Sequence, residues 1–253
     1  VENNWYDKLC ENALISTGNN GRLERALAKL EAGENVNIAF LGGSITEGAS
    51  ASKQSECYVE QTVSNLKAMY PDADINYVNA GVSGTPSALG IMRYQRDIVG
   101  TFDDTPDILF IDFAVNDYQE CTDGRAMESL IRQALEADEK TAVCLLYSIS
   151  KSKWNVQDVS VPMGELYGLP MVSLKDGTKE AFESGALTDE EYFTDDYHPT
   201  TYGHTIMADC IKYMFTEAAK KEVPAEASGI PDKMVKGADF DGNRLVTSKD
   251  SAD

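Results

Sequence analysis

Short apolar segments that recur along the chain, with helical patterns between them, constrain its fold most. These segments are apolar almost throughout, which is typical of strands buried on both faces of a parallel sheet. We predict strands at 37–42, 75–80, 108–115, 142–149 and 171–174. The apolar residues between them recur at helical spacing and predict helices at 21–33, 55–70, 87–100, 125–139 and 200–222. This alternation predicts an α/β fold with a doubly wound, five-stranded parallel sheet.

The chain of 253 residues is long enough for one large domain. We assign residues 1–222 to this domain, with 1–36 as an N-terminal helical extension. Residues 223–253 contain two prolines, three glycines and no helical pattern, which predicts a linker with one short strand near 244–247. This segment either wraps the domain or begins a C-terminal accessory module.

The composition excludes several classes of function. A net charge of −20 repels nucleic acids and anionic membranes. No apolar run approaches the roughly 18 residues of a membrane span.

The first residues lack the basic and apolar stretches of a signal peptide, which predicts a cytoplasmic location unless such a peptide has been trimmed. Five cysteines without a CxxC pair predict buried thiols in a reducing compartment, with no disulfide framework and no metal site.

Ligands of an open α/β sheet bind at the carboxyl ends of its strands, so the residues that follow each strand are candidates for chemistry. Ser44 follows the first strand in GGSITEG, Gly84 the second in NAGVSG, and Asn116 the third in FAVND. The first segment lacks the lysine of a phosphate-binding P-loop. Ser44 is therefore either the cap of the following helix or a nucleophile.

A serine nucleophile needs a base, and the chain has only two histidines, His198 and His204. In DDYHP, Pro199 prevents a regular helix, so a loop can bring Asp195 back to the Nδ1 side of His198. Asp196, two residues before the histidine, points elsewhere. We expect His204, inside the last helix, to pack or cap.

An acyl-transfer site also needs hydrogen-bond donors for a developing oxyanion. The candidates are the backbone N–H groups of Ser44 and Gly84 and the side-chain amide of Asn116. Glycine allows close approach of the backbone, and an amide donates without carrying a charge.

The four segments with Ser44, Gly84, Asn116 and His198 resemble, in order and context, the four blocks of the SGNH (GDSL-type) hydrolases. The resemblance spans Asn37 to about Glu222. It implies a flavodoxin-like three-layer α/β/α sandwich and ester hydrolysis by a Ser-His-Asp triad without metal or cofactor. It implies Ser44 as nucleophile, His198 as base, Asp195 as its orienting acid, and Gly84 and Asn116 as oxyanion donors.

The chain departs from many members of the family at Gly43 and Ile45, where Asp and Leu are common, and at Ala114, where Gly is common. The GGSIT form is similar to that of members acting on acetylated plant polysaccharides. The sequence therefore predicts a serine esterase that removes acetyl groups from xylan- or mannan-type glycans. A lipase, thioesterase or arylesterase for hydrophobic acyl esters, and a non-catalytic glycan-binding module, stay open as alternatives.

Aromatic residues that follow strands at the same edge could stack on a sugar face. The candidates for substrate contact are Tyr118, Tyr147 and Trp154. The expected partner is thus an acetylated carbohydrate. A homodimer and a C-terminal carbohydrate-binding module are also compatible with the sequence.

Overall fold

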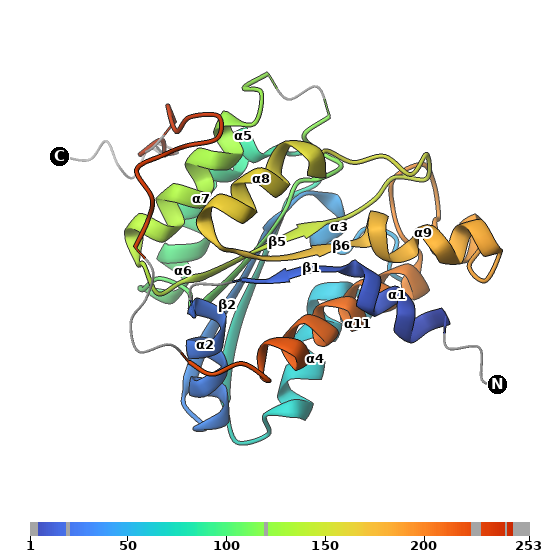
Figure 1. Cartoon of the computed structure of the whole chain (residues 1–253), viewed down its shortest axis with the longest axis horizontal. Helices are drawn as coiled ribbons and strands as arrows, with labels where there is room; N and C mark the ends of the chain where they lie inside the picture. Colours follow the sequence, from blue (N-terminus) through green and yellow to red (C-terminus); the bar gives the residue numbers. More distant parts are fainter. Residues whose placement is uncertain (1–4, 19–20, 119–120, 224–228, 241, 245–253) are drawn as a thin grey trace.

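The computed structural model describes residues 5–18, 21–118, 121–223, 229–240 and 242–244. A single sheet forms its centre, with helices on both faces (Figure 1). The strands are β1 (Leu14–Thr17), β2 (Asn35–Gly42), β3 (Asp74–Gly81), β4 (Ile108–Asp112), β5 (Ala142–Tyr147) and β6 (Pro170–Ser173). Their order is β1-β6-β5-β4-β2-β3, and the five strands β2 to β6 are parallel. This order of the parallel strands is the flavodoxin-like one, which confirms the predicted fold class.

The sheet has six strands, so the predicted count of five is wrong. The additional strand, β1, pairs antiparallel with β6, with Leu14 opposite Val172 and Thr17 opposite Pro170. The N-terminal region 1–36 is therefore not a purely helical extension, because it contributes a strand to the sheet. With four residues, β1 is too short to show a strand pattern in the sequence.

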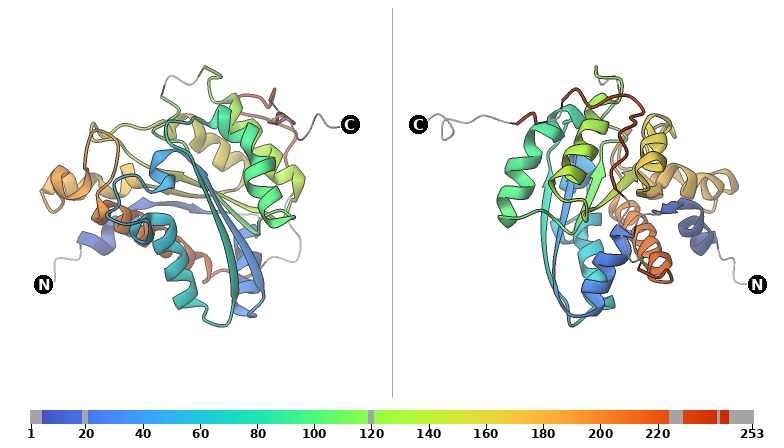
Figure 2. Two further views of the ribbon diagram at one scale, coloured as in Figure 1. Left: turned by 180° about the vertical axis from the view of Figure 1, so that it is seen from behind. Right: turned by 60° about the vertical axis from the view of Figure 1, so that its left-hand side comes forward.

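Two layers of helices enclose the sheet, as the further views in Figure 2 show. Alternate residues of β2 serve the two layers: Ile38 and Phe40 belong to one apolar cluster, and Ala39 and Leu41 to the other. The first layer contains α1 (Trp5–Ala13), α2 (Arg22–Glu31), α4 (Tyr58–Met69), α9 (Leu174–Ser184) and α11 (Thr201–Ala218). The second contains α5 (Ser87–Tyr94), the π-helical η2 (Gln95–Val99), α6 (Gly100–Phe102), α7 (Arg125–Ala137) and α8 (Gln157–Tyr167).

Three short helical segments lie in the connections between the longer elements: α3 (Ser44–Glu47), η1 (Gln54–Glu56) and α10 (Asp189–Tyr192). Strands β4 and β5 end earlier than predicted, because residues 113–115 and 148–149 continue as buried loops at the carboxyl edge of the sheet. Burial makes such loop residues as apolar as strand residues. Among the described helices, none has the length and apolar character needed to cross a membrane.

Residues 229–240 of the C-terminal segment lie along α7, and we call them the C-terminal strap. Glu128 of α7 holds it: the carboxylate accepts hydrogen bonds from the backbone N–H groups of Val235 (2.7 Å), Lys236 (2.5 Å) and Gly237 (2.8 Å). The hydroxyl of Tyr167 donates to the same carboxylate at 2.8 Å. The strap thus packs against α7, and the expected C-terminal accessory module stays a prediction. Of the strand expected near 244–247, residues 245–247 lie outside the described residues.

We predict that Glu128→Gln weakens the attachment of the strap. Burial alone would raise the pKa of Glu128, but the four donors outweigh it and lower this pKa, so the carboxylate is the bound form. An amide has one acceptor oxygen and presents an N–H group to the remaining donors. The free energy of unfolding should fall by about 2–3 kcal/mol, and limited proteolysis should cut the strap sooner. Glu180→Gln on α9, at an ion pair with Lys8 that is exposed on both sides, should change stability by less than about 0.5 kcal/mol; equal effects would contradict the assignment.

Candidate active site

The predicted nucleophile, base and oxyanion donors converge at the carboxyl edge of the sheet. A pocket of about 470 Å³ opens there between the ends of β2, β3 and β4 and the loop before α11. Its lining residues are Ser44, Ile45, Ala49, Ser83, Gly84, Val115, Asn116, Tyr118, Tyr197 and His198. Residues from four separate parts of the chain thus share one cavity, as the topology of a parallel sheet predicts.

Ser44 is the first residue of α3 and follows β2 after one residue, Gly43. The capping position belongs to Gly43, so the side chain of Ser44 is not used as a helix cap. Its Oγ lies 2.9 Å from Nε2 of His198. The absence of a side chain at Gly43 matters here, because a Cβ atom at that position would lie 2.2 Å from Oδ1 of Asn116. The Asn116 side chain therefore lies directly over the turn that carries Ser44.

The loop before α11 holds His198 and Asp195 together. The bridge between Phe193 and Pro199 closes this loop. Oδ2 of Asp195 lies 2.7 Å from Nδ1 of His198, and Oδ1 accepts the backbone N–H groups of Tyr197 and His198, each at 2.8 Å. Burial would raise the pKa of Asp195, but these hydrogen bonds outweigh it and lower the pKa to about 2. The carboxylate is therefore ionised at neutral pH and favours a proton on Nδ1.

Asp196 differs from its neighbour, although the two are adjacent in sequence. Its backbone carbonyl accepts the N–H of Lys151 at 2.8 Å, and its side chain is exposed. The hydrogen bond between Ser44 and the imidazole therefore continues to Asp195, at the separation of three residues that the sequence analysis favoured.

Gly84 and Asn116 line the same pocket as Ser44. Gly84 has a φ of 72°, in the left-handed region that favours glycine, and no heavy atom lies within 4 Å of where its Cβ would be. Among the described residues, neither the backbone N–H of Gly84 nor the Asn116 amide is used in a hydrogen bond. Both groups can therefore donate to a ligand in the pocket.

The three aromatic candidates have different environments. Tyr118 lines the pocket and is 60% exposed, and Trp154 packs edge-on against it with a centroid distance of 4.9 Å. Tyr147 is not at the site: it is buried in the second apolar cluster, where its hydroxyl lies 3.5 Å from Sδ of Met171. It ends β5 with its side chain toward the helices, because side chains alternate along a strand.

Tyr197 lines the pocket with 53% of its surface exposed, and the sequence analysis did not name it. Its only signal in the sequence is its place directly before His198.

The other histidine, His204, is buried in α11. Its Nδ1 accepts the N–H of Tyr58 at 3.2 Å and its Nε2 donates to the carbonyl of Ala49 at 3.0 Å. Burial lowers the pKa of His204, so this ring is neutral and fixes Ala49, two residues after the end of α3.

A buried carboxyl group lies beneath the site. Asp112 ends β4, and its Oδ1 accepts the hydroxyl of Ser148 at 2.8 Å and the N–H of Ala114 at 3.3 Å. Its Oδ2 is buried without a hydrogen-bond partner among the described residues. Burial raises the pKa of Asp112 to about 6, although its hydrogen bonds act in the opposite direction.

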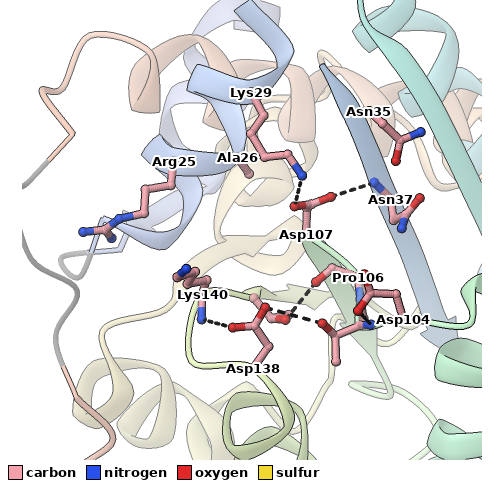
Figure 3. A pocket seen from close by; sticks show the side chains of 12 residues that line it. Arg25, Ala26, Lys29, Asn35, Asn37, Asp104, Pro106, Asp107, Asp138 and Lys140 are labelled. Carbon is pink, nitrogen blue, oxygen red and sulfur yellow. Dashed lines mark hydrogen bonds and ion pairs between the residues drawn. The ribbon is translucent and has the colours of Figure 1, made fainter. Parts of the chain in front are cut away.

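A second cavity, of about 540 Å³, lies at the opposite edge, where β2, β4 and β5 begin (Figure 3). Two of its charged groups pair: Nζ of Lys29 lies 2.6 Å from Oδ1 of Asp107, whose Oδ2 accepts the N–H of Asn37. This second cavity contains none of the predicted site residues.

Within the described residues, no group of three histidine, cysteine, aspartate or glutamate side chains is arranged to hold a metal ion.

Comparison with known proteins identifies the family of the chain. Residues 40–206 match the GDSL-like lipase/acylhydrolase family. An acetylxylan esterase from Geobacillus stearothermophilus is 25% identical over 207 residues, which cover 71% of this chain and 93% of that protein. The solved structure of an acetylxylan esterase from the same organism matches with 22% identity and a TM-score of 0.54, which shows a shared fold.

A two-domain esterase active on acetylated mannans is more similar in structure. Its crystal structure has 32% sequence identity to this chain and a TM-score of 0.81. The match covers 89% of this chain and 60% of that one, so the present chain spans about three fifths of this relative. The match with the family model extends over more than half of the chain, and the chain belongs to the GDSL-like lipase/acylhydrolase family. This membership confirms the resemblance found in the sequence and places the chain among the carboxylic ester hydrolases.

The buried Asp112 predicts how stability depends on pH. A carboxyl with a pKa near 6 in the folded state and 3.9 in the unfolded state binds its proton more tightly when folded. The free energy of unfolding should therefore fall by about 3 kcal/mol as pH rises from about 4 to above 6. Asp112→Asn should remove this loss, so chemical denaturation should find the variant more stable than the wild type at pH 7 by about 1–3 kcal/mol and equal to it at pH 4. Glu183→Gln, an exposed carboxyl on α9, should leave the profile unchanged; an unchanged profile in Asp112→Asn would refute the assignment.

Proposed function

We propose that this chain is a carbohydrate acetyl esterase that works through Ser44, His198 and Asp195. One observation carries the proposal: a continuous line of hydrogen bonds joins Ser44 Oγ to His198 Nε2 (2.9 Å) and His198 Nδ1 to Asp195 Oδ2 (2.7 Å) at the wall of an open pocket. A serine hydroxyl becomes a nucleophile when a base accepts its proton, and an oriented imidazole is such a base.

The reaction begins when Ser44 Oγ forms a bond to the acetyl carbonyl carbon and its proton passes to Nε2 of His198. The carbonyl oxygen becomes an oxyanion, for which the N–H groups of Ser44 and Gly84 and the amide of Asn116 are the proposed donors. Asp195 stabilises the imidazolium through Nδ1–H. The bond from carbon to the sugar oxygen then breaks, and that oxygen takes the proton from Nε2. Water, deprotonated by His198, then attacks the acetyl carbon. The bond from that carbon to Ser44 Oγ breaks, Oγ takes the proton back from Nε2, and acetate leaves.

Two observations favour an acetylated glycan as the substrate. The related esterases act on acetylxylan and on acetylated mannans. The exposed rings of Tyr118 and Tyr197 line the pocket, and Trp154 extends this aromatic surface beyond it. Sugar faces stack on such rings, and a neutral glycan is not repelled by a chain of net charge −20.

We predict that Ser44→Ala abolishes acetate release from acetylated xylan and mannan oligosaccharides, with kcat/KM lower by at least about 10³-fold. The variant should keep its thermal stability, because the Ser44 side chain does not cap α3. Retained turnover would end the proposal. A serine-directed fluorophosphonate should label the wild type and not the variant; an unlabelled wild type would favour the glycan-binding module. Faster hydrolysis of octanoyl than of acetyl aryl esters would favour a lipase or thioesterase.

We also predict that the two adjacent aspartates differ. Asp195→Asn removes the charge that stabilises the imidazolium and should lower kcat by about 10²–10⁴-fold. Because the pKa of Asp195 is about 2, this carboxylate is ionised at every pH from 5 to 9, and the defect should be present throughout that range. Asp196→Asn is the matched control, since its side chain is exposed, and it should stay within about twofold of the wild type. Equal losses in the two variants would contradict the assignment of Asp195.

A further inference from the structure

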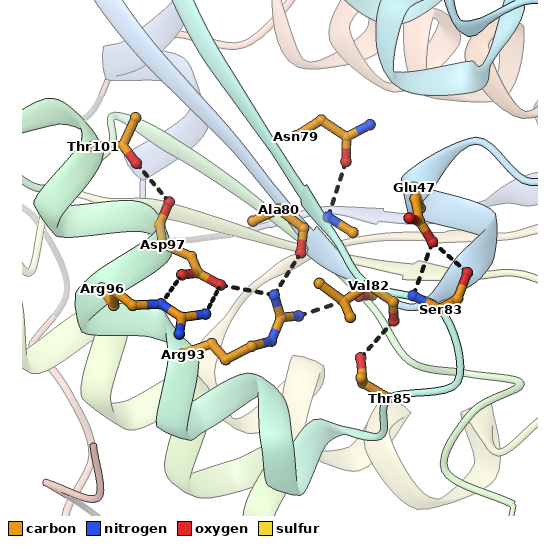
Figure 4. A network of polar contacts seen from close by, with 12 residues as sticks. Glu47, Asn79, Ala80, Val82, Ser83, Thr85, Arg93, Arg96, Asp97 and Thr101 are labelled. Atoms are coloured by element: carbon orange, nitrogen blue, oxygen red, sulfur yellow. Dashed lines mark hydrogen bonds and ion pairs between the residues drawn. The ribbon is translucent and has the colours of Figure 1, made fainter. Parts of the chain in front are cut away.

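The loop after β3, residues 82–86, carries Gly84 and is attached to α3 by a side chain that the mechanism does not use. Glu47, the last residue of α3, accepts the backbone N–H of Ser83 on its Oε2 at 2.9 Å. The same oxygen also accepts the Ser83 hydroxyl (Figure 4). One carboxylate oxygen therefore fixes both the backbone and the side chain of the residue directly before Gly84.

Gly84 itself supplies little restraint on this loop. Its φ is positive, and no heavy atom lies within 4 Å of the position of a Cβ. Glycine loses more conformational freedom on ordering than any other residue. Inside the loop, the N–H and the hydroxyl of Thr85 bond to the carbonyl of Val82, but these contacts do not link the loop to α3. A defined position for the Gly84 N–H relative to Ser44 thus requires contacts from outside the loop.

Next to the contact between Glu47 and Ser83, the backbone at the end of β3 packs directly against the backbone of α3. A Cβ atom at Gly81 would lie 2.1 Å from the backbone nitrogen of Glu47. Nδ2 of Asn79 donates to the carbonyl of Thr46 at 2.8 Å. Strand β3 and helix α3 therefore have a fixed separation up to residue 81. The N–H of Val82 bonds to the carbonyl of Gly42 at 3.0 Å, and the Glu47 side chain extends the attachment to Ser83.

A buried arginine fixes the two strand ends below. Nη1 of Arg93 donates to the carbonyl of Ala80 at 3.1 Å (Figure 4). Nη2 donates to the carbonyl of Gly42 at 3.4 Å. Asp97 pairs with this guanidinium at 2.9 Å. Gly42 precedes the turn to Ser44, and Ala80 precedes the loop that carries Gly84. The two segments with backbone donors thus start from strand ends joined by one side chain.

We propose that Glu47 and Ser83 are positioning residues, which hold the N–H of Gly84 beside Ser44 so that both backbone donors face the same oxyanion. The inference rests on the proposed function and adds two residues to it. Neither residue is assigned contact with the reacting atoms. Hydrogen-bond donors that are oriented before the charge develops stabilise a transition state without a cost of reorganisation. The contact between Glu47 and Ser83 fixes the orientation of the Gly84 N–H in this way.

The test compares Glu47→Ala with Glu47→Gln in acetyl ester hydrolysis. Removing the attachment should lower kcat by about 10–100-fold, less than the 10²–10³ that removal of a donor costs, and should change KM by less than about threefold. The glutamine oxygen can take the place of Oε2 and accept both the N–H and the hydroxyl of Ser83, so Glu47→Gln should recover most of kcat. Phenylboronic acid, which forms a tetrahedral adduct on a nucleophilic serine, should inhibit Glu47→Ala with a Ki raised by a similar factor.

Glu56→Ala in the nearby η1 is the matched control, since the side chain of Glu56 contacts Lys53 at 3.8 Å and no residue of the 82–86 loop. It should leave kcat and the boronate Ki within twofold of the wild type. Wild-type values of both parameters in Glu47→Ala would overturn the inference while leaving the proposed function intact. A defect in Glu47→Gln as large as in Glu47→Ala would also overturn it, because charge rather than attachment would then matter. A wild type that neither hydrolyses acetyl esters nor reacts with fluorophosphonate would refute both proposals.

Discussion

The hydrogen bond between Ser44 and His198 joins residues that are 154 positions apart in the chain, and the rest of the site depends on it. It forms because parallel strands deliver the residues that follow them to one edge of the sheet. β2 brings Ser44 to that edge, and the loop closed by the bridge between Phe193 and Pro199 brings the imidazole. The rest of the fold, including both helical layers, holds these two short segments at a fixed distance from each other.

Polar groups in the interior hold the surroundings of this hydrogen bond in place. His204 fixes the carbonyl of Ala49 just after α3, Arg93 ties the ends of β2 and β3, and Asp112 orders the start of the loop that carries Asn116. Each of these groups is nearly inaccessible to solvent. Buried polar groups are costly unless they are hydrogen-bonded. Oδ2 of Asp112 has no hydrogen-bond partner among the described residues, so Asp112 lowers the stability of the fold while its Oδ1 orders the loop that carries Asn116.

The sequence was sufficient for the parallel strands, most long helices and the residues at the strand ends, because these depend on periodicity and on topology. It was insufficient where local patterns are weak or misleading. β1 is too short for a pattern, and α8 contains Pro162, which argues against a helix. Tyr147 was expected at the site because it ends a strand, but the direction of its side chain depends on the strand's register. Glu47 resembles any exposed glutamate in sequence, since its contact with Ser83 exists only after the fold has formed.

The close approach of Asn116 to Gly43 couples two positions that lie far apart in the sequence. A methyl group at position 43 would fall within 2.7 Å of the Asn116 amide nitrogen, and a flexible side-chain end moves away more easily than a backbone does. A larger residue at 43 would therefore displace the amide rather than disrupt the sheet. The two positions form an epistatic pair, so a change at 43 is tolerated only together with a compensating rearrangement at 116, and its effect falls on turnover before it falls on folding.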